Sequence, residues 1–282
     1  MVQAVNPGTP DVVLICSLDR FPSVSYSARL QKSDIELLQG NCLELLDAME
    51  PERFDCVWAD PPYFLSNGGI TCHAGKMVKV HKGDWDKSKG PELNHEFNLE
   101  WLKRCQRVLK PNGTIWITGT LHVIHDIGFG LQQLGFKLLN DISWEKPNPP
   151  PNLSCRYFTH STETILWASR GLKSKHLFNY KAMKAITGKQ MKTVWRMTSP
   201  GKDEKSFGKH PTQKPLALVE RCILASTNEN DLVLDPFLGG GTTAIACIKT
   251  GRRCVGIELD EKHFELAKKR VDAEFNKPKE LL

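Results

Sequence analysis

Strand-like and helix-like stretches alternate along most of this chain of 282 residues, and this alternation restricts the possible fold more than any other feature. Apolar runs of strand length occur at 35–38, 54–60, 113–119, 136–144, 163–169, 231–235 and 252–259. Segments with apolar residues at helical spacing lie at 39–49, 97–109, 121–135, 215–227, 240–251 and 260–275. The pattern predicts an α/β fold with an open, mostly parallel, doubly wound sheet.

Two segments interrupt the alternation. Residues 1–33 contain three prolines and no sustained periodicity, so we expect a loosely ordered N-terminal extension. Residues 170–209 lack the strand and helix pattern and are rich in basic residues. We expect this second segment to form an inserted region of the domain.

Positive charge is concentrated in and just after that insertion. The whole chain has a net charge of +6, whereas the stretch from Arg170 to Lys214 contains twelve Lys or Arg and only two acidic residues, a net charge of +10. The stretch also contains Phe178, Tyr180 and Trp195, and basic and aromatic residues together are typical of a nucleic-acid-binding surface. A charge run can also be only a solvated face. We predict contact with DNA or RNA.

Composition excludes several other classes of protein. The longest apolar runs, such as residues 12–16, are far too short to span a membrane, and the N-terminus lacks the features of a signal peptide. We therefore expect a cytoplasmic protein without membrane contact. The nine cysteines are scattered without a C-x-x-C pair, so we expect reduced thiols and predict no metal site.

The segment WADPPY, residues 58–63, follows a strand-like run with an acidic residue, two prolines and an aromatic ring. Its simplest interpretation is a strand end, because proline lacks an N–H and pushes the preceding Asp60 into an extended conformation. Alternatively, Asp60 and the carbonyl groups of this stiff turn form a fixed cluster of hydrogen-bond acceptors beside the ring of Tyr63. Such a cluster suits a planar amino group.

The segment DLVLDPFLGGGTTAIAC, residues 231–247, predicts a strand, a glycine-rich turn and a helix that begins near Gly241. Glycines allow the backbone to approach a ligand and a helix N-terminus favours acceptor groups, although tight packing alone can also require glycines. The next strand ends near Glu258, where a doubly wound fold would hold a ribose diol. Because the loop has no strict G-x-G-x-x-G spacing, we predict a nucleoside cofactor other than a nicotinamide dinucleotide.

A third segment, GKHPTQKPLALVE at 208–220, places Lys214 and Pro215 at the start of a predicted helix. Proline fits the first helical turn, and Lys214 could reach an anionic group. The simpler interpretation of His210 and Thr212 is that they cap this helix.

In this order, DPPY at 60–63, HPTQKP at 210–215 and DPFLGGGTT at 235–243 resemble the motifs of the beta-class amino-methyltransferases of DNA. The N6-adenine enzymes of the cell-cycle-regulated and restriction-associated types are the most similar in character. The resemblance extends from about Leu38 to Ala273 and includes WEKPNPPPN and HSTETILWAS. It implies methyl transfer from S-adenosylmethionine to N6 of a flipped-out adenine.

The resemblance also implies an organisation and partners. Residues 34–169 would form the catalytic half of a methyltransferase domain, 170–209 a basic insertion for DNA recognition, and 210–275 the cofactor-binding half. Double-stranded DNA would be the partner, with single-stranded DNA as an alternative, and the protein would be a homodimer.

Roles follow from the resemblance residue by residue. Asp60 and the Pro61 carbonyl would accept hydrogen bonds from the target amine and Tyr63 would stack on the base, giving the catalytic set Asp60, Pro61, Pro62 and Tyr63. The cofactor would contact Asn41, Cys42, Asp60, Lys214, Asp235, Phe237, Gly239, Gly241, Thr242, Thr243 and Glu258. The candidates for DNA contact are Asn67, Arg156, Lys181, Lys184, Lys189, Lys192 and Arg196.

One position departs from the family. Asn41 stands where these enzymes usually have an aspartate that accepts from the cofactor's adenine amine. The amide oxygen of Asn41 can still accept, but the charge-assisted part of that hydrogen bond, on the order of 1 kcal/mol, would be lost.

Three alternative functions remain open at this point. An N4-cytosine methyltransferase uses similar acceptors. Family members with serine in place of Asp60 tend to be of that type, so Asp60 favours adenine as the target here. Methylation of RNA or of protein glutamine usually goes with asparagine at that position and without a long basic insertion. A binding-only protein is disfavoured because every catalytic position is filled.

Overall fold

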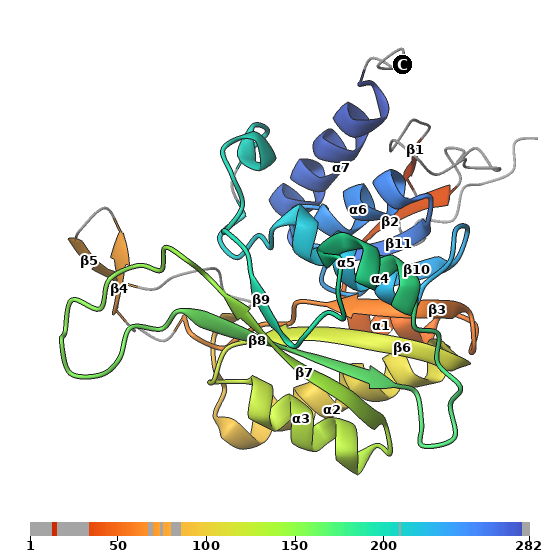
Figure 1. The fold of residues 1–282 in the computed structure, drawn as a ribbon, viewed down its shortest axis with the longest axis horizontal. Helices are drawn as coiled ribbons and strands as arrows, with labels where there is room; N and C mark the ends of the chain where they lie inside the picture. Colours follow the sequence, from red (N-terminus) through yellow and green to blue (C-terminus); the bar gives the residue numbers. More distant parts are fainter. Residues whose placement is uncertain are drawn as a thin grey trace, which may run out of the picture.

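The computed structural model describes residues 13–15, 34–66, 70–73, 76–79, 86–208 and 210–277 (Figure 1). In these ranges a nine-stranded sheet has the order β1-β2-β11-β10-β3-β6-β8-β7-β9, and β4 pairs with β5 in a separate hairpin. Only β1 and β8 run opposite to the other described strands of the large sheet. The predicted open, mostly parallel α/β sheet is confirmed.

The strands are β1 Val13–Ile15, β2 Ile35–Gln39, β3 Phe54–Ala59, β4 Ile70–His73, β5 Lys76–Lys79, β6 Leu109–Gly119, β7 Lys137–Glu145, β8 Thr162–Ser169, β9 Val194–Arg196, β10 Leu232–Asp235 and β11 Arg253–Glu258. The helices are α1 Cys42–Asp47, α2 Pro91–Val108, α3 Ile124–Gln133, α4 Tyr180–Thr187, α5 Leu216–Ser226, α6 Thr242–Thr250 and α7 Glu261–Phe275, with a short 3₁₀ helix at Asp203–Lys205. Of the predicted extension at 1–33, all but β1 lies outside the described residues.

Helices cover both faces of the sheet, with α1, α2 and α3 on one face and α4 to α7 on the other (Figure 1). Successive residues of a strand point to opposite faces, so Cys56 and Trp58 of β3 pack in one apolar cluster and Val57 and Ala59 in the other. Burial on both faces explains why the central strands read as continuous apolar runs.

The last third of the chain inserts two strands between strands of the first third. β10 and β11 lie between β2 and β3, and Leu234 pairs with Val57 while Glu258 pairs with Gln39. Parallel strands that are in register end at the same edge, so the carboxyl ends of β2, β3, β10 and β11 meet there. Ligands of open α/β sheets bind at this edge.

The basic segment at 170–209 contributes to the main sheet and core. β9 pairs with β7, and the buried Trp195 lies 6.3 Å between ring centroids from Trp116. On α4, Met183 is buried in the same cluster as residues of α5. The segment is therefore anchored in the domain, and its role in recognition stays a prediction.

The start of α2 differs most from the expected one, and the start of α5 is capped by an unexpected residue. α2 begins at Pro91, six residues earlier than predicted. Proline suits the first helical turn, and the prediction missed residues 91–96 because they have no apolar periodicity. α5 begins after Pro215, and its first N–H, on Leu216, donates to the Glu204 carboxylate at 2.8 Å. The interpretation of His210 and Thr212 as helix caps was therefore wrong.

Some features are absent from the part of the chain that the structure describes. None of its helices combines the length and the apolar character needed to cross a bilayer. Within the same ranges, no group of three or more His, Cys, Asp or Glu is arranged to hold a metal ion. The described cysteines are free thiols, and Cys155 is the exposed one among them.

Candidate active site

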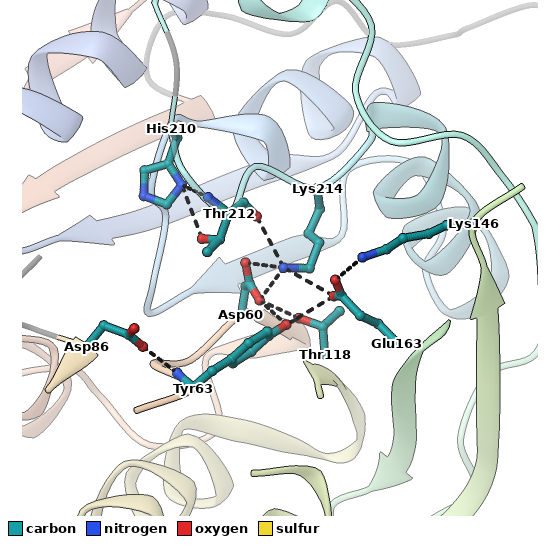
Figure 2. Close-up of polar contacts among 9 residues, drawn as sticks. All are labelled: Asp60, Tyr63, Asp86, Thr118, Lys146, Glu163, His210, Thr212 and Lys214. Atoms are coloured by element: carbon teal, nitrogen blue, oxygen red, sulfur yellow. Dashed lines mark hydrogen bonds and ion pairs between the residues drawn. The ribbon is translucent and has the colours of Figure 1, made fainter. Parts of the chain in front are cut away.

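Asp60 directly follows β3 and lies at the centre of a network of charged and hydroxyl side chains (Figure 2). The Lys214 ammonium donates to both carboxylate oxygens at 2.7 Å. The Tyr63 hydroxyl donates to Oδ1 at 2.8 Å and the Thr118 hydroxyl to the same oxygen at 2.6 Å. Oδ1 thus receives three donors and Oδ2 receives Lys214, so Oδ2 has the greater capacity to accept from a ligand.

A second carboxylate and a second ammonium surround this centre. Glu163 forms an ion pair with Lys146 and lies 3.7 Å from the Lys214 nitrogen. Burial alone lowers the pKa of Lys214, but the attraction of Asp60 and Glu163 outweighs it and raises that pKa above its ordinary value. Burial alone raises the pKa of Glu163, yet Lys214 and Lys146 hold it below its ordinary value. Both groups are therefore charged at neutral pH.

The turn after Asp60 is held by Asp86, which is completely buried. Its Oδ1 accepts from the backbone N–H of Tyr63 at 3.0 Å, and its Oδ2 accepts from the N–H of Leu65 at 3.3 Å and the hydroxyl of Ser66 at 2.7 Å. The Asp86 carboxylate therefore fixes the position of the Tyr63 backbone. No sequence pattern pointed to this residue.

Tyr63 is buried beside Lys214. Its side chain is only 4% exposed, the Lys214 nitrogen lies 5.1 Å from its ring centroid, and neither Tyr63 nor Pro61 lines the neighbouring cavity. Pro62 does line it. The stacking of a base on Tyr63 stays a prediction.

A cavity of about 360 Å³ opens beside Asp60 at the carboxyl edge of the sheet. Small-molecule sites occupy roughly 300–1,000 Å³. Every predicted cofactor residue except Gly241 contributes to its lining: Asn41, Cys42, Asp60, Lys214, Asp235, Phe237, Gly239, Thr242, Thr243 and Glu258. The fold thus brings together residues that are more than 200 positions apart in the chain.

Gly241 is explained by packing. It precedes α6 with a φ of 81°, and a Cβ there would lie 3.0 Å from the Cβ of Ala267 on α7. Gly239 has a φ of 54°, and its Cβ would lie 3.2 Å from the His210 ring. These two glycines permit close approach between parts of the protein around the cavity.

Two carboxylates give the cavity an affinity for positive charge. Burial, reinforced by the nearby Asp60 and Glu258, raises the pKa of Asp235 to about 7. Burial also raises the pKa of Glu258, whose two oxygens accept from the backbone N–H groups of Gly239 at 2.7 Å and Asp260 at 2.8 Å. A cationic group bound here would favour the ionised form of both carboxylates. The lining therefore fits a ligand that carries sulfonium or ammonium charge.

Sequence reasoning missed several residues around the cavity and the network. His210 and His263 both line the cavity, with ring centroids 4.3 Å apart, and Phe97 lines it beside Phe237. HPTQKP contains His210, so a signal existed there. The positions of Thr118, Glu163 and Lys146 depend on strand neighbours, and no motif marked them.

Asn41 begins α1 as its N-cap, because its amide oxygen accepts from the Leu43 N–H at 3.0 Å. This amide oxygen, which the family resemblance assigned to the cofactor, thus already accepts one hydrogen bond. Cys42, the next residue, is buried, and burial raises the pKa of its thiol to about 12. It lines the cavity as a neutral apolar group.

The predicted DNA-contact residues do not form one cluster. Arg156 lies in the exposed loop between β7 and β8, and Arg196 on β9 lies 3.6 Å from the Glu145 carboxylate at the end of β7. Lys181 and Lys184 lie on α4. The residue before α4, Asn179, donates its backbone N–H to the Ala225 carbonyl at the C-terminal end of α5. α5 begins beside Lys214 and its 11 residues extend about 16 Å, so α4 lies at the end of α5 that is distant from Lys214. Lys189 and Lys192 lie between α4 and β9, and Asn67 lies outside the described residues.

Comparison with known proteins identifies the family. The model of the N6 and N4 methyltransferase family, described as DNA methylase, matches residues 54–269. The chain belongs to this DNA methylase family. It is an S-adenosylmethionine-dependent DNA methyltransferase, as the resemblance implied.

Relatives of this DNA methylase cover most of its length. It is 53% identical to the type II methyltransferase M2.DpnII of Streptococcus pneumoniae, over 86% of this chain and 91% of the relative. It is 49% identical to M2.MboI of Moraxella bovis, over 84% and 87% of the two chains. The crystal structure of the M1.HpyAVI complex with S-adenosylmethionine superimposes with a TM-score of 0.64 at 32% identity, covering 84% of this chain and 99% of that one.

Proposed function

We propose that this DNA methyltransferase transfers the methyl group of S-adenosylmethionine to N6 of adenine within a specific DNA sequence. The observation that carries the proposal is the Asp60 carboxylate, which is fixed by three side-chain partners at the rim of the cavity. A charged acceptor at this position favours adenine over cytosine N4 among the family's substrates. The type II methyltransferases to which the chain is similar support a restriction-modification role.

The protein's part in the reaction is to orient and polarise the amine. The lone pair of adenine N6 is delocalised into the ring, so the nitrogen is a weak nucleophile until an acceptor draws on its protons. The free capacity of Asp60 Oδ2 suits an N–H of the amino group, while Tyr63, Thr118 and Lys214 hold the carboxylate in place. A preorganised acceptor stabilises the positive charge that develops on nitrogen as it attacks.

When it is bound, S-adenosylmethionine supplies an electrophilic methyl group on its sulfonium. We assign Glu258 to the ribose hydroxyl groups and Asp235 to the cationic methionine part. Phe237, Gly239, Thr242 and Thr243 also line the cavity. The carboxylate of Asp235, whose pKa is raised, gains from a positively charged ligand, and this gain supports its assignment.

The remaining assignments extend this proposal. Residues 34–169 act as the catalytic half and 210–275 as the cofactor-binding half, and the inserted segment at 170–209 contacts the DNA. The protein acts in the cytoplasm as a homodimer. Light scattering combined with size-exclusion chromatography tests the dimer directly, and a monomeric mass would remove that part.

Incubation of unmethylated DNA with the protein and isotope-labelled S-adenosylmethionine tests the central proposal. Mass spectrometry of the digested nucleosides should reveal labelled N6-methyladenine, and methylation-sensitive sequencing should place it in one short sequence. Label in N4-methylcytosine would overturn the choice of base. The Asp60→Ala variant should lose the activity, while Asp272→Ala, which removes an exposed carboxylate on α7, should retain it.

A further inference from the structure

The loop that joins β7 to β8, residues 146–161, leaves the sheet at the active site. Its first residue, Lys146, forms an ion pair with Glu163 and donates its backbone N–H to the Ser161 carbonyl at 2.8 Å. Glu163 in turn lies 3.3 Å from the Tyr63 hydroxyl and 3.7 Å from the Lys214 nitrogen (Figure 2). The base of this loop is therefore bonded to the side chains that hold Asp60.

The tip of the loop is exposed and is organised by its own hydrogen bonds. All residues from 153 to 160 are exposed. The Asn152 amide donates to the Tyr157 carbonyl at 2.6 Å and accepts from the Ser154 N–H at 3.1 Å and the Ser154 hydroxyl at 2.7 Å. This arrangement leaves the Phe158 side chain 95% exposed beside Tyr157, which is 61% exposed.

A partner that covers Phe158 would gain from its burial, because removing an apolar side chain from water is favourable. The charge of the loop indicates which partner that is. Residues 146–162 contain Lys146 and Arg156 and no acidic residue. A flat apolar ring beside positive charge is complementary to stacked bases beside phosphate groups.

The position of the loop agrees with that partner. β7 runs parallel to β3 and β6 within the sheet, so the loop extends from the same carboxyl edge as the Asp60 turn. Figure 1 shows it reaching out on the same side of the molecule as the β4–β5 hairpin. DNA that presents an adenine to Asp60 therefore approaches the face from which Phe158 projects.

We propose that Phe158 enters the base stack of a DNA duplex at the place that the target adenine leaves. The inference rests on the proposed function, because the Asp60 carboxylate can reach an amino group only after the base has left the stack. Extrusion opens a gap between the neighbouring base pairs, and an inserted apolar ring restores part of the lost stacking. Phe158 thus lowers the cost of extruding the base and takes no part in the methyl transfer itself.

The test compares duplex and single-stranded oligonucleotides that carry the mapped recognition sequence. Phe158→Ala should lower the rate of duplex methylation by about tenfold or more, because the unstacking cost of a few kcal/mol is no longer offset. Its rate on the single strand should equal that of the wild type, since no stack has to be opened. In a duplex with 2-aminopurine at the target position, the fluorescence increase on binding should shrink in the same variant.

Two further variants separate this role from a general loss of surface or of fold. Phe158→Trp keeps a flat apolar ring and should retain duplex activity. Phe129→Ala removes another exposed aromatic ring, 57% exposed, from α3, which lies outside the proposed DNA-contacting segment, and should behave like the wild type.

Several outcomes overturn the proposal. Equal duplex rates for Phe158→Ala and the wild type would show that the ring is not needed to open the stack. An equal loss on both substrates would assign the ring to strand binding, and a changed oligomeric mass would assign it to a subunit contact. A wild-type protein that methylates the single strand alone would also remove the role. If the wild type forms no N6-methyladenine on either substrate, the proposed function fails first.

Discussion

Thr118→Val tests whether the position of the Asp60 carboxylate limits the rate of methyl transfer. The Thr118 hydroxyl is completely buried and donates to Oδ1 at 2.6 Å, and valine replaces that hydroxyl with a methyl group of similar size. A hydrogen bond to a charged group contributes about 1.5–3 kcal/mol. Because Tyr63 and Lys214 continue to hold Oδ1, we take the lower value, which corresponds to a decrease in kcat of about tenfold.

Single-turnover methylation with saturating cofactor measures this effect, and calorimetry measures the dissociation constant of the cofactor. Thr118 does not line the cavity, so that constant should stay within about twofold of the wild-type value. Thr118→Ser keeps the donor and should retain most of the rate.

Thr114→Val is the matched control, since Thr114 is also buried on β6 but lies four residues, about 13 Å, before Thr118. A wild-type rate for Thr118→Val, or an equal loss for both valine variants, would refute the idea that this hydroxyl positions Asp60.

Four further predictions concern binding and pH. Burial raises the pKa of Asp235 to about 7, so the affinity for a cationic cofactor should increase as the pH rises towards 7, by up to about tenfold per pH unit, and should stay constant above it. Calorimetry should show an affinity that does not change with pH for Asp235→Asn. The same pKa shift should lower the free energy of unfolding of the free protein as the pH rises from 3.8 to about 7, because the Asp235 carboxyl ionises at a lower pH in the unfolded chain than in the folded one. Urea titrations should show this pH dependence in the wild type and not in Asp235→Asn. Glu258→Ala should weaken cofactor binding by roughly 1.5–3 kcal/mol, and unchanged calorimetry would remove Glu258 from the ribose site. Changing Lys181, Lys184, Lys189 and Lys192 to alanine should flatten the dependence of log affinity on log salt by about 0.9 per lost phosphate contact. An unchanged slope would make this basic stretch only a solvated face.

Local patterns in the sequence predicted the fold class, and the family resemblance predicted ten of the residues that line the cavity. Strand-length apolar runs separated by helical periodicity are a direct consequence of a parallel sheet covered on both faces, and the elements at 54–59 and 253–258 appeared where expected. Asp60 and Glu258 were identified because each ends such a strand, and parallel strands deliver their ends to one edge. The sequence missed the first six residues of α2, which carry no apolar repeat, and it missed α4 and β9 in the basic segment.

Only the tertiary structure decided which side chains reach Asp60. Lys214 was expected near an anionic ligand but donates to Asp60, and Thr118 donates to that carboxylate because β6 is the neighbour of β3. Glu163 reaches Lys214 and the Tyr63 hydroxyl from β8, on the other side of β6. Tyr63 keeps its ring against Lys214 instead of facing the cavity.

The sequence by itself determined the elements and the residues at their ends, because hydrophobic period and turn chemistry are local properties of a chain. The order of strands, which inserts β10 and β11 between β2 and β3, and the rotamers around Asp60 depend on packing between residues that are distant in the sequence. Contacts of that kind leave no periodic signal, and for this reason the hydrogen bonds that hold Asp60 became visible only in three dimensions.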